Sequence, residues 1–412
     1  MRDLFKIAIR NLLRYKRRTL LTASLITLGV VFVLVFISVS GSFKAMMVGQ
    51  ITDSMLGDIQ VHRRGYVASI DNLPLNLNLK SPAFKELEEI LNSEKEVESY
   101  SSRVKFGGLF SNFVETTNIR LNGVDPEREF KTVPLLTSRI SAGEKTLRKG
   151  DILIPVLLSK GMNVKLGDSV VIVATNLDGS VNGKTFTVSG ILESATGPGG
   201  RDGYIHIDDA REVLRMSDME VSEVAIRIRD FDKLDAVTQK LEDLLAKYKT
   251  AKGGPLFEVH SWEALSPFYN IARMIDVMTF FIKLMLIAIV LISIMNVMIM
   301  AVYERIREIG TIAAIGTLPG KILSMFVIEG FCLGILGTLA GNILGGIILI
   351  ILNLSGISFD FAQQKGLLLT VTLRPWDMAV ISVIVIIVSV IASLQPAFKA
   401  SRMEPIDALR HV

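Results

Sequence analysis

The amino-acid sequence predicts an α-helical integral membrane protein with four transmembrane helices and a large α+β extracytoplasmic domain inserted between helices 1 and 2. The first observation is a set of four long runs without a charged residue, at 19–43, 284–303, 330–359 and 378–398. Each reaches the roughly 18–20 residues that a helix needs to cross about 30 Å of hydrocarbon. The second observation is that 50% of the 412 residues are hydrophobic and only 21% are charged, against about 25% charged in soluble domains. A soluble globular enzyme is therefore excluded.

Residues 1–18 are predicted to form a cytoplasmic amphipathic N-terminal helix ahead of transmembrane helix 1 at 19–43. One face of this helix is cationic and carries Lys6, Arg10, Arg14 and Arg17. The opposite face is apolar and carries Leu4, Phe5, Ala8, Ile9 and Leu12. This pattern is typical of a helix lying in the headgroup region, whereas a simple positive anchor explains the charges but not their spacing. A cleaved signal peptide is less favoured, because the apolar run exceeds the usual 7–15 residues.

Residues 44–270 are predicted to form the extracytoplasmic (periplasmic) α+β domain. Two β-rich runs, 169–174 and 185–192, flank the turn sequences Asp178-Gly179 and Asn182-Gly183. Such turn dipeptides between β-rich runs indicate a hairpin. Further strands are expected at 205–207 and 224–228, and amphipathic helices at 83–91 and 232–249.

The second half of the chain is predicted to alternate between membrane helices and short connections. A stalk and transmembrane helix 2 cover 271–303, and the helical pattern is expected to start at Trp262 and to continue through Pro267. The remaining segments, in chain order, are a cytoplasmic loop at 304–321, transmembrane helix 3 at 322–359, an extracytoplasmic loop at 360–377, transmembrane helix 4 at 378–398 and a cytoplasmic tail at 399–412.

The distribution of Lys and Arg sets the predicted orientation. The flanks 1–18, 304–321 and 399–412 carry seven, three and three of these residues, whereas the loop 360–377 carries two. Since cytoplasmic flanks are richer in Lys and Arg, both termini are predicted to be cytoplasmic in a multi-pass inner-membrane protein. The same positions exclude nucleic acid as a partner, because the basic excess lies beside membrane helices and meets anionic lipid.

The sequence contains no credible catalytic set, and the chain is predicted to be non-catalytic. Cys332 is the only cysteine, and none of the four histidines lies in a predicted span or in an H-E-x-x-H pattern. No metal site is therefore expected. The stretch 179–185 resembles a phosphate-binding loop, but it is one residue short and precedes strand-like residues instead of a helix. Lys283 and Glu329 lie near span ends, where a snorkelling side chain or an interfacial salt bridge is expected.

The third span carries a stripe of small residues at spacings of three and four. These are Gly330, Gly334, Gly337, Gly341 and Gly345. Because small residues let membrane helices approach closely, the stripe is predicted to pack against other helices, with a hinge as the alternative.

The cytoplasmic connection at 304–321 is the most informative stretch. After a charged turn it carries apolar residues at helical spacing: Ile309, Ile312, Ala313 and Ile315. Gly316 suits a helix stop, and Pro319 suits the start of the next helix. An apolar helix at the membrane face needs a partner to cover it, and the alternative is a helix resting on lipid.

The same connection carries a family resemblance. Glu304-Arg-x-Arg-Glu-Ile-Gly-x-x-x-Ala-Ile-Gly316 resembles the signature between the second and third spans of FtsX-type ABC permeases. The ending Pro396-Ala-x-Lys-Ala-Ser-Arg-x-x-Pro-Ile-x-Ala-Leu-Arg410 is similar to the family's P-A-x-x-A-A-R-x-x-P-x-x-A-L-R, with Ser401 in place of the second Ala. This superfamily includes the macrolide exporter MacB, the lipoprotein-release permeases LolC and LolE, and FtsX itself. The layout of one span, a large outer domain and three spans matches along essentially the whole chain.

The resemblance implies that 304–321 holds the coupling helix, seated on an ABC ATPase dimer that binds ATP and Mg, while this chain holds no cofactor. The implied coupling residues are Glu304, Arg305, Arg307, Glu308, Gly310, Ala314, Ile315 and Gly316. A permease dimer, formed with a second copy or a paralogue, is implied as well. Closure of the ATPase would then be transmitted to the outer domain.

Within the superfamily, the stretches Gly41-Ser-Phe-Lys44, Gly57-Asp-Ile-Gln60 and Gly123-Val-Asp-Pro126 look most like the lipoprotein-release permeases. The implied function is extraction of lipoproteins from the outer leaflet of the inner membrane, with transfer to a periplasmic carrier. Entry between the first two spans implies a substrate path lined by Phe43, Met46, Met47, Met274, Met278 and Phe281. The alternative is that these side chains face lipid or pack against neighbouring residues.

Two other functions of the superfamily stay open. One is MacB-like export of a peptide, drug or lipid with an adaptor and an outer-membrane channel. The other is an FtsX-like non-transporting regulator of cell-wall hydrolases, against which the outer domain of about 230 residues weighs.

Overall fold

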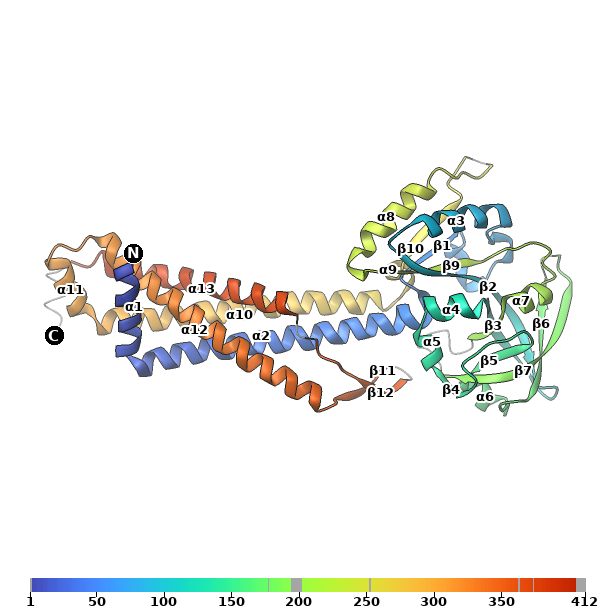
Figure 1. Cartoon of the computed structure of the whole chain (residues 1–412), viewed down its shortest axis with the longest axis horizontal. Coiled ribbons are helices and arrows are strands. Elements are labelled where there is room, and N and C mark those ends of the chain that lie inside the picture. Colours follow the sequence, from blue (N-terminus) through green and yellow to red (C-terminus); the bar gives the residue numbers. More distant parts are fainter. Residues whose placement is uncertain are drawn as a thin grey trace. The chain divides into compact units, whose positions relative to one another are not determined.

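The computed structural model describes residues 2–176, 178–193, 202–251, 253–361, 364–372 and 374–404. The chain divides into two compact units (Figure 1). A helical unit comprises Met1–Ala45, Arg273–Ser358 and Leu368–Val412, and an outer unit comprises Met46–Ala272 and Phe359–Leu367.

The helical unit contains long apolar helices. Among the described residues, four helices are long and apolar enough to cross a membrane. They are α2 (Lys16–Ile51), α10 (Tyr269–Glu304), α12 (Pro319–Leu354) and α13 (Pro375–Ser401). The unit also contains two shorter helices: α1 (Arg2–Arg14), which precedes α2, and α11 (Ile306–Ala314), which lies between α10 and α12. One apolar cluster with members on all four long helices forms the core of this unit.

Several helix boundaries differ from the sequence-based expectation for local physical reasons. The N-terminal helix ends at Arg14, and the residues from Lys16 onward already belong to α2. The third long helix was expected to reach residue 359 but ends at Leu354, because Gly356 takes a left-handed φ of +56° that interrupts the helix. The expected loop 360–377 contains part of a two-stranded sheet, β11 (Ser358–Phe361) and β12 (Gln364–Leu368).

The expected continuous helix from Trp262 through Pro267 is wrong. The short helix α9 covers only Trp262–Leu265, and α10 begins at Tyr269. Ser266 is extended, with φ −107° and ψ 127°. The reason is local, because a residue that precedes proline is driven out of the helical region and proline itself has no N–H to donate.

The outer unit is built on a mixed sheet, in agreement with an α+β domain. Within the described residues the sheet has ten strands, in the order β10-β1-β9-β2-β3-β8-β5-β7-β4, with β6 paired to β2 and β7. The strands are β1 (Ile59–Arg63), β2 (Val97–Ser111), β3 (Thr116–Val124), β4 (Ile140–Gly143), β5 (Asp151–Pro155), β6 (Ser169–Thr175), β7 (Val181–Leu192), β8 (Asp202–His206), β9 (Glu223–Ile228) and β10 (Phe257–Ser261). The pairs β3–β8 and β5–β7 are parallel.

The predicted hairpin is confirmed, since β6 and β7 pair antiparallel from Ser169 opposite Thr187 to Thr175 opposite Val181. The helix expected at 232–249 is shorter, and α8 covers Leu234–Leu245. The other α-helices of the unit are α3 (Ser81–Ser93), α4 (Pro126–Thr132), α5 (Leu135–Ser138), α6 (Val156–Gly161) and α7 (Ile207–Val213). Short 3-10 turns lie at Val67–Asn72, Leu75–Leu77 and Phe231–Lys233, and a π-helical turn at Thr52–Leu56.

Candidate functional site

The helix α11 forms an elbow between two long helices of the helical unit (Figure 1). α10 ends at Glu304, and Arg305 leaves the helical region with φ −115° and ψ 16°. At the other end, Gly316 has φ +96° and donates its N–H to Ala313 O at 2.9 Å, while Thr317 N donates to Ile312 O at 3.3 Å. These two bonds form a Schellman stop. The prediction of Gly316 as a helix stop is therefore confirmed, as is Pro319 as the first residue of the next helix.

The elbow α11 is apolar on two faces, and among the described residues only one of these faces is covered. Ile306 and Ile309 are 8% and 2% exposed and pack into the helical unit. On the other side Ile312 is 37% exposed and Ile315 81% exposed. Leu318, after the helix stop, is 65% exposed. Large apolar side chains left exposed close together in this way indicate a contact site for another molecule.

A buried arginine holds the start of the elbow to the neighbouring helices. The Arg305 side chain is 5% exposed; its Nε donates to Glu308 Oε2 at 3.2 Å and its Nη1 to Glu329 Oε2 at 3.4 Å. Glu329 belongs to α12 and is fully buried. Because removing one partner of a buried ion pair leaves an uncompensated charge, the two side chains hold α12 and the elbow together. Of the two alternatives expected for Glu329, the structure shows the salt bridge, with Arg305 as its partner.

Aromatic rings complete this group, called here the Arg305 cluster: Arg305, Glu308, Glu329, Tyr15 and Phe326. The Arg305 guanidinium carbon lies 5.5 Å from the centre of the Tyr15 ring and 5.9 Å from that of Phe326. Both distances fall within the range of a cation–π contact. The Tyr15 hydroxyl also donates to Glu308 Oε1 at 3.5 Å. The elbow therefore contacts both the α1–α2 junction and α12.

The predicted coupling residues take different places. Arg305 and Glu308 meet in the Arg305 cluster, and Gly310 is buried on α11. The other five are exposed: Glu304, Arg307, Ala314, Ile315 and Gly316. Tyr15 and Phe326 were not expected, because nothing in the local sequence distinguishes them from other aromatic residues at a membrane interface.

The glycine stripe of α12 faces two different helices. A Cβ added to Gly330 would lie 2.6 Å from Ser393 Cβ of α13, and one added to Gly334 would lie 2.8 Å from Ser389 Oγ. The next three glycines face α2. Their added Cβ atoms would approach side chains there at 2.5 to 2.7 Å: Gly337 to Ile26, Gly341 to Val30 and Gly345 to Leu34. Each of these separations is shorter than ordinary van der Waals contact, so a larger residue would force its neighbours to shift; at Gly345 only the end of the Leu34 side chain would have to move.

The C-terminal motif contributes small buried residues to the helical unit. Ala397 and Ala400 of α13 are buried, and Ser401 is 8% exposed. The rest of the motif, at 405–410, lies outside the described residues.

The six residues proposed for a substrate path do not form one surface. Met274, Met278 and Phe281 are more than half exposed and recur at helical spacing on one face of α10. Phe43 and Met46 are half-buried. Met47 is a correction, because it is fully buried in the apolar core of the outer unit and presents no surface to a ligand.

The end of α2 is held inside the outer unit by two arginines that the sequence analysis did not single out. Arg139, which follows α5, is 5% exposed. Its Nη1 donates to Ser54 O of the π-helical turn at 3.0 Å, and its Nη2 donates to Glu193 O at 2.9 Å. Arg227 of β9 pairs with Asp53 at 2.7 Å. The helix end is therefore tied to β9 and to the segment that precedes β4.

Two buried carboxyl groups of the outer unit, Asp58 and Glu223, have pKa values shifted in opposite directions. Burial raises the pKa of Asp58 to about 6, although the Ile228 N–H that it accepts acts in the opposite direction. Burial also acts to raise the pKa of Glu223, but Lys105, His62 and Arg103 outweigh it and hold that pKa well below its ordinary value. Arg103 joins Glu223 at 2.9 Å to Glu129 of α4 at 2.8 Å.

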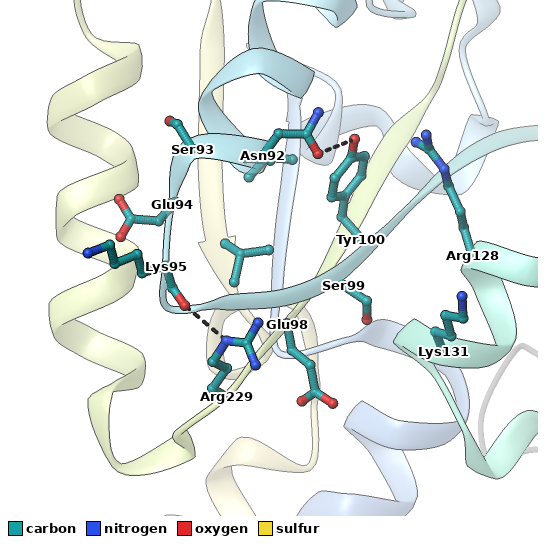
Figure 2. A pocket seen from close by; sticks show the side chains of 12 residues that line it. Asn92, Ser93, Glu94, Lys95, Glu98, Ser99, Tyr100, Arg128, Lys131 and Arg229 are labelled. Atoms are coloured by element: carbon teal, nitrogen blue, oxygen red, sulfur yellow. Dashed lines mark hydrogen bonds between the residues drawn. The ribbon is translucent and has the colours of Figure 1, made fainter.

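Figure 2 shows a polar cleft of about 430 Å³ where the end of α3, the start of β2 and α4 meet. The Tyr100 hydroxyl donates to Asn92 Oδ1 at 3.1 Å, and Arg229 Nε donates to Lys95 O at 3.0 Å. Three of the six charged side chains in its wall form ion pairs within the unit: Glu94 with Lys240, Glu98 with Arg227 and Arg128 with Glu88. These ion pairs link the helices and strands around the cleft, so the cleft lies at a junction between them.

Comparison with known proteins identifies two matching segments. Residues 19–244 match the family model of the MacB-like periplasmic core domain, which is more than half of the chain. Residues 280–405 match the model of the FtsX-like permease C-terminal region.

Whole-protein relatives extend this match. The lipoprotein-releasing system transmembrane protein LolC of Xylella fastidiosa is 27% identical over 316 residues, which cover 71% of this chain and 72% of that protein. LolC of Neisseria meningitidis is 24% identical over 95% of this chain and 94% of that protein. The uncharacterized ABC transporter permease YknZ of Bacillus subtilis is 25% identical over 98% of both chains.

Proposed function

The chain belongs to the family of the MacB-like periplasmic core domain and also carries an FtsX-like permease region, and from this premise we propose that it is the permease subunit of an ABC transporter. In this proposal the chain is a multi-pass protein of the inner membrane and catalyses no reaction itself. A partner ATPase dimer binds ATP and Mg, and a second permease, either a copy or a paralogue, completes the assembly. Both termini and α11 lie in the cytoplasm.

The observation that carries the proposal is the uncovered apolar face of α11. Ile312, Ile315 and Leu318 are exposed at the turn that joins two membrane helices. A soluble partner that buries these side chains gains the free energy of removing apolar surface from water, about 25 cal/mol per Å². The ATPase is the partner for which this elbow is suited.

In this proposal the Arg305 cluster transmits movement of the elbow α11 to the neighbouring helices. Glu329 on α12 and Tyr15 at the α1–α2 junction both contact Arg305. Because a buried ion pair with ring contacts holds its members in a fixed geometry, a displacement of α11 is passed to α12 and α2 as well as to α10. Since α2 ends in the π-helical turn held by Arg139 and Arg227, its motion reaches the sheet of the outer unit.

The proposed substrate is a lipoprotein extracted from the outer leaflet and passed to a periplasmic carrier. Support comes from the similarity to proteins named as LolC over most of the chain. Met274, Met278 and Phe281 supply an exposed apolar face of α10, and flexible Met side chains adapt to acyl chains of varied shape.

MacB-like export of a peptide, drug or lipid is the second candidate, and one observation favours it. The family model that covers most of the chain is that of the MacB-like periplasmic core domain. In this case an adaptor and an outer-membrane channel replace the carrier.

Purification of the tagged protein from its native membrane in mild detergent, followed by mass spectrometry, tests the proposal. We expect an ABC ATPase to co-elute, together with acylated lipoproteins. A co-eluting adaptor or cell-wall hydrolase in place of lipoproteins would reject lipoprotein release in favour of another function of the superfamily. The absence of any ATPase after gentle cross-linking would contradict the transporter proposal itself.

A further inference from the structure

A small apolar crevice lies between three long helices of the helical unit. Its volume is about 70 Å³, and α2, α10 and α13 contribute its lining. The floor is made of buried aliphatic side chains: Val33, Leu286, Ile381 and Val385. At the rim, Val380 and Ile384 remain more than a third exposed. A cavity with such walls stays dry and takes apolar groups.

The rim also carries two charges of opposite sign. Lys283 of α10 and Asp377, in the first turn of α13, both line the crevice. Within the described part of the chain, neither makes an ion pair with another residue. An ionised side chain beside an apolar region is costly unless a partner of opposite charge is present.

The position of these charges along the helices places them at a membrane surface. Lys283 lies 21 residues before Glu304, the last residue of α10, which is about 32 Å at 1.5 Å per residue. Asp377 lies 22 residues before Lys399 near the end of α13, which is about 33 Å. Since the hydrocarbon core is about 30 Å thick, both rim charges lie at headgroup level, on the side of the membrane opposite to α11.

The crevice is separate from the proposed substrate face of α10. At 100° per residue, Lys283, Leu286 and Ile287 point to the side of the helix opposite to Met274, Met278 and Phe281. A ligand in the crevice therefore does not compete for the same surface.

We propose that this crevice binds a phospholipid whose headgroup carries both a phosphate and a primary ammonium, such as phosphatidylethanolamine. The Lys283 ammonium receives the phosphate, and the Asp377 carboxylate accepts hydrogen bonds from the lipid ammonium. Part of one acyl chain enters between Val33, Leu286 and Val385. The headgroup neutralises both rim charges, and the lipid bridges α10 and α13 at their outer ends.

The test uses the full chain, purified and exchanged through detergent containing equal amounts of phosphatidylethanolamine, phosphatidylcholine and phosphatidylglycerol. Native mass spectrometry then measures which lipid is retained. We expect phosphatidylethanolamine to be retained about two- to fivefold over each of the others, because each headgroup contact is a partly exposed ion pair. Choline has no N–H, so phosphatidylcholine cannot donate to Asp377.

Three variants assign the contacts. Asp377→Asn should abolish the preference over phosphatidylcholine, and Lys283→Gln should lower retention of all three lipids. Lys321→Gln, an exposed lysine in the first turn of α12, should behave like the unmodified chain. Equal retention of the three lipids by the unmodified chain would overturn the proposal. A disulfide between two copies of an Ile384→Cys variant, made in a Cys332→Ser background, would overturn it as well, since the crevice would then be covered by a second permease.

Discussion

The glycine stripe of α12 allows a sharply defined perturbation, Gly341→Ala. The added Cβ would lie 2.6 Å from Val30 Cβ and 3.2 Å from Thr27 O, whereas carbon atoms prefer about 3.5–4.0 Å. α12 and α2 must therefore move apart locally by about 1 Å. Overpacking of this kind costs about 1–3 kcal/mol.

The same helix provides the matched control. A Cβ added to Gly346 meets nothing within 4 Å, so Gly346→Ala adds no clash. Both variants gain the same helix propensity, about 1 kcal/mol in water. The difference between them therefore isolates the packing cost, and Gly341→Ala should be the less stable variant by about 1–3 kcal/mol.

The assay is unfolding of the full chain in mixed micelles of mild detergent and SDS, followed by circular dichroism. The midpoint for Gly341→Ala should fall at a lower SDS fraction than for Gly346→Ala, and Gly346→Ala should equal or exceed the unmodified chain. Equal midpoints for the two variants would refute the close approach of α12 and α2.

Three further predictions follow from the elbow and the outer unit. Ile315→Asp places a charge at a position where the side chain is 81% exposed, so membrane insertion should be unchanged. In the reconstituted complex, ATP hydrolysis should become uncoupled from release of substrate. Full activity of this variant would contradict the coupling role. In Arg139→Lys the single ammonium cannot reach both Ser54 O and Glu193 O. Thermal unfolding should therefore show that the outer unit loses about 1–3 kcal/mol of its free energy of unfolding. The exposed control Arg148→Lys should show no loss. The pKa of Asp58 is about 6 in the folded state, against 3.8 when the carboxyl is exposed in the unfolded chain. The folded state therefore binds the proton more tightly, and the stability that this group contributes falls as pH rises from about 4 to 6. The difference in melting temperature between the unmodified chain and Asp58→Asn should therefore change over that window, and a constant difference would reject the raised pKa.

The membrane helices could be predicted because their signal is local. A run of 20 or more uncharged residues is sufficient to identify a span, and Gly316 and Pro319 mark the ends of two helices by their own backbone preferences. The hairpin of β6 and β7 was likewise found from its turn residues.

The long strand β2 was missed because its burial depends on distant residues. Ser101, Ser102 and Arg103 are all buried, which breaks the alternation of apolar and polar residues expected of a strand. The charge on Arg103 is compensated by Glu129 and Glu223, the second of which is 120 residues away in the chain. No local pattern predicts such a pairing.

The candidate site shows the same division. The family motif identified Arg305 and Glu308. Their contact with Tyr15 could not be predicted, because it joins residues almost 300 positions apart. Tyr15 also lies in a basic segment that was predicted to contact lipid headgroups. Met47 was likewise predicted to line the substrate path because it is apolar and close in sequence to Phe43 and Met46. The fold instead buries it in the core of the outer unit.

The most direct test of the proposed coupling role is site-specific photocross-linking from Ile315 in native membranes. A photoreactive amino acid at this position should capture an ABC ATPase, identified by mass spectrometry of the cross-linked product. The same group at Phe113, which is 67% exposed in the outer unit, should not. Capture of lipid alone from position 315, with no ATPase, would show that α11 rests on the membrane and would contradict its role as the seat of the ATPase.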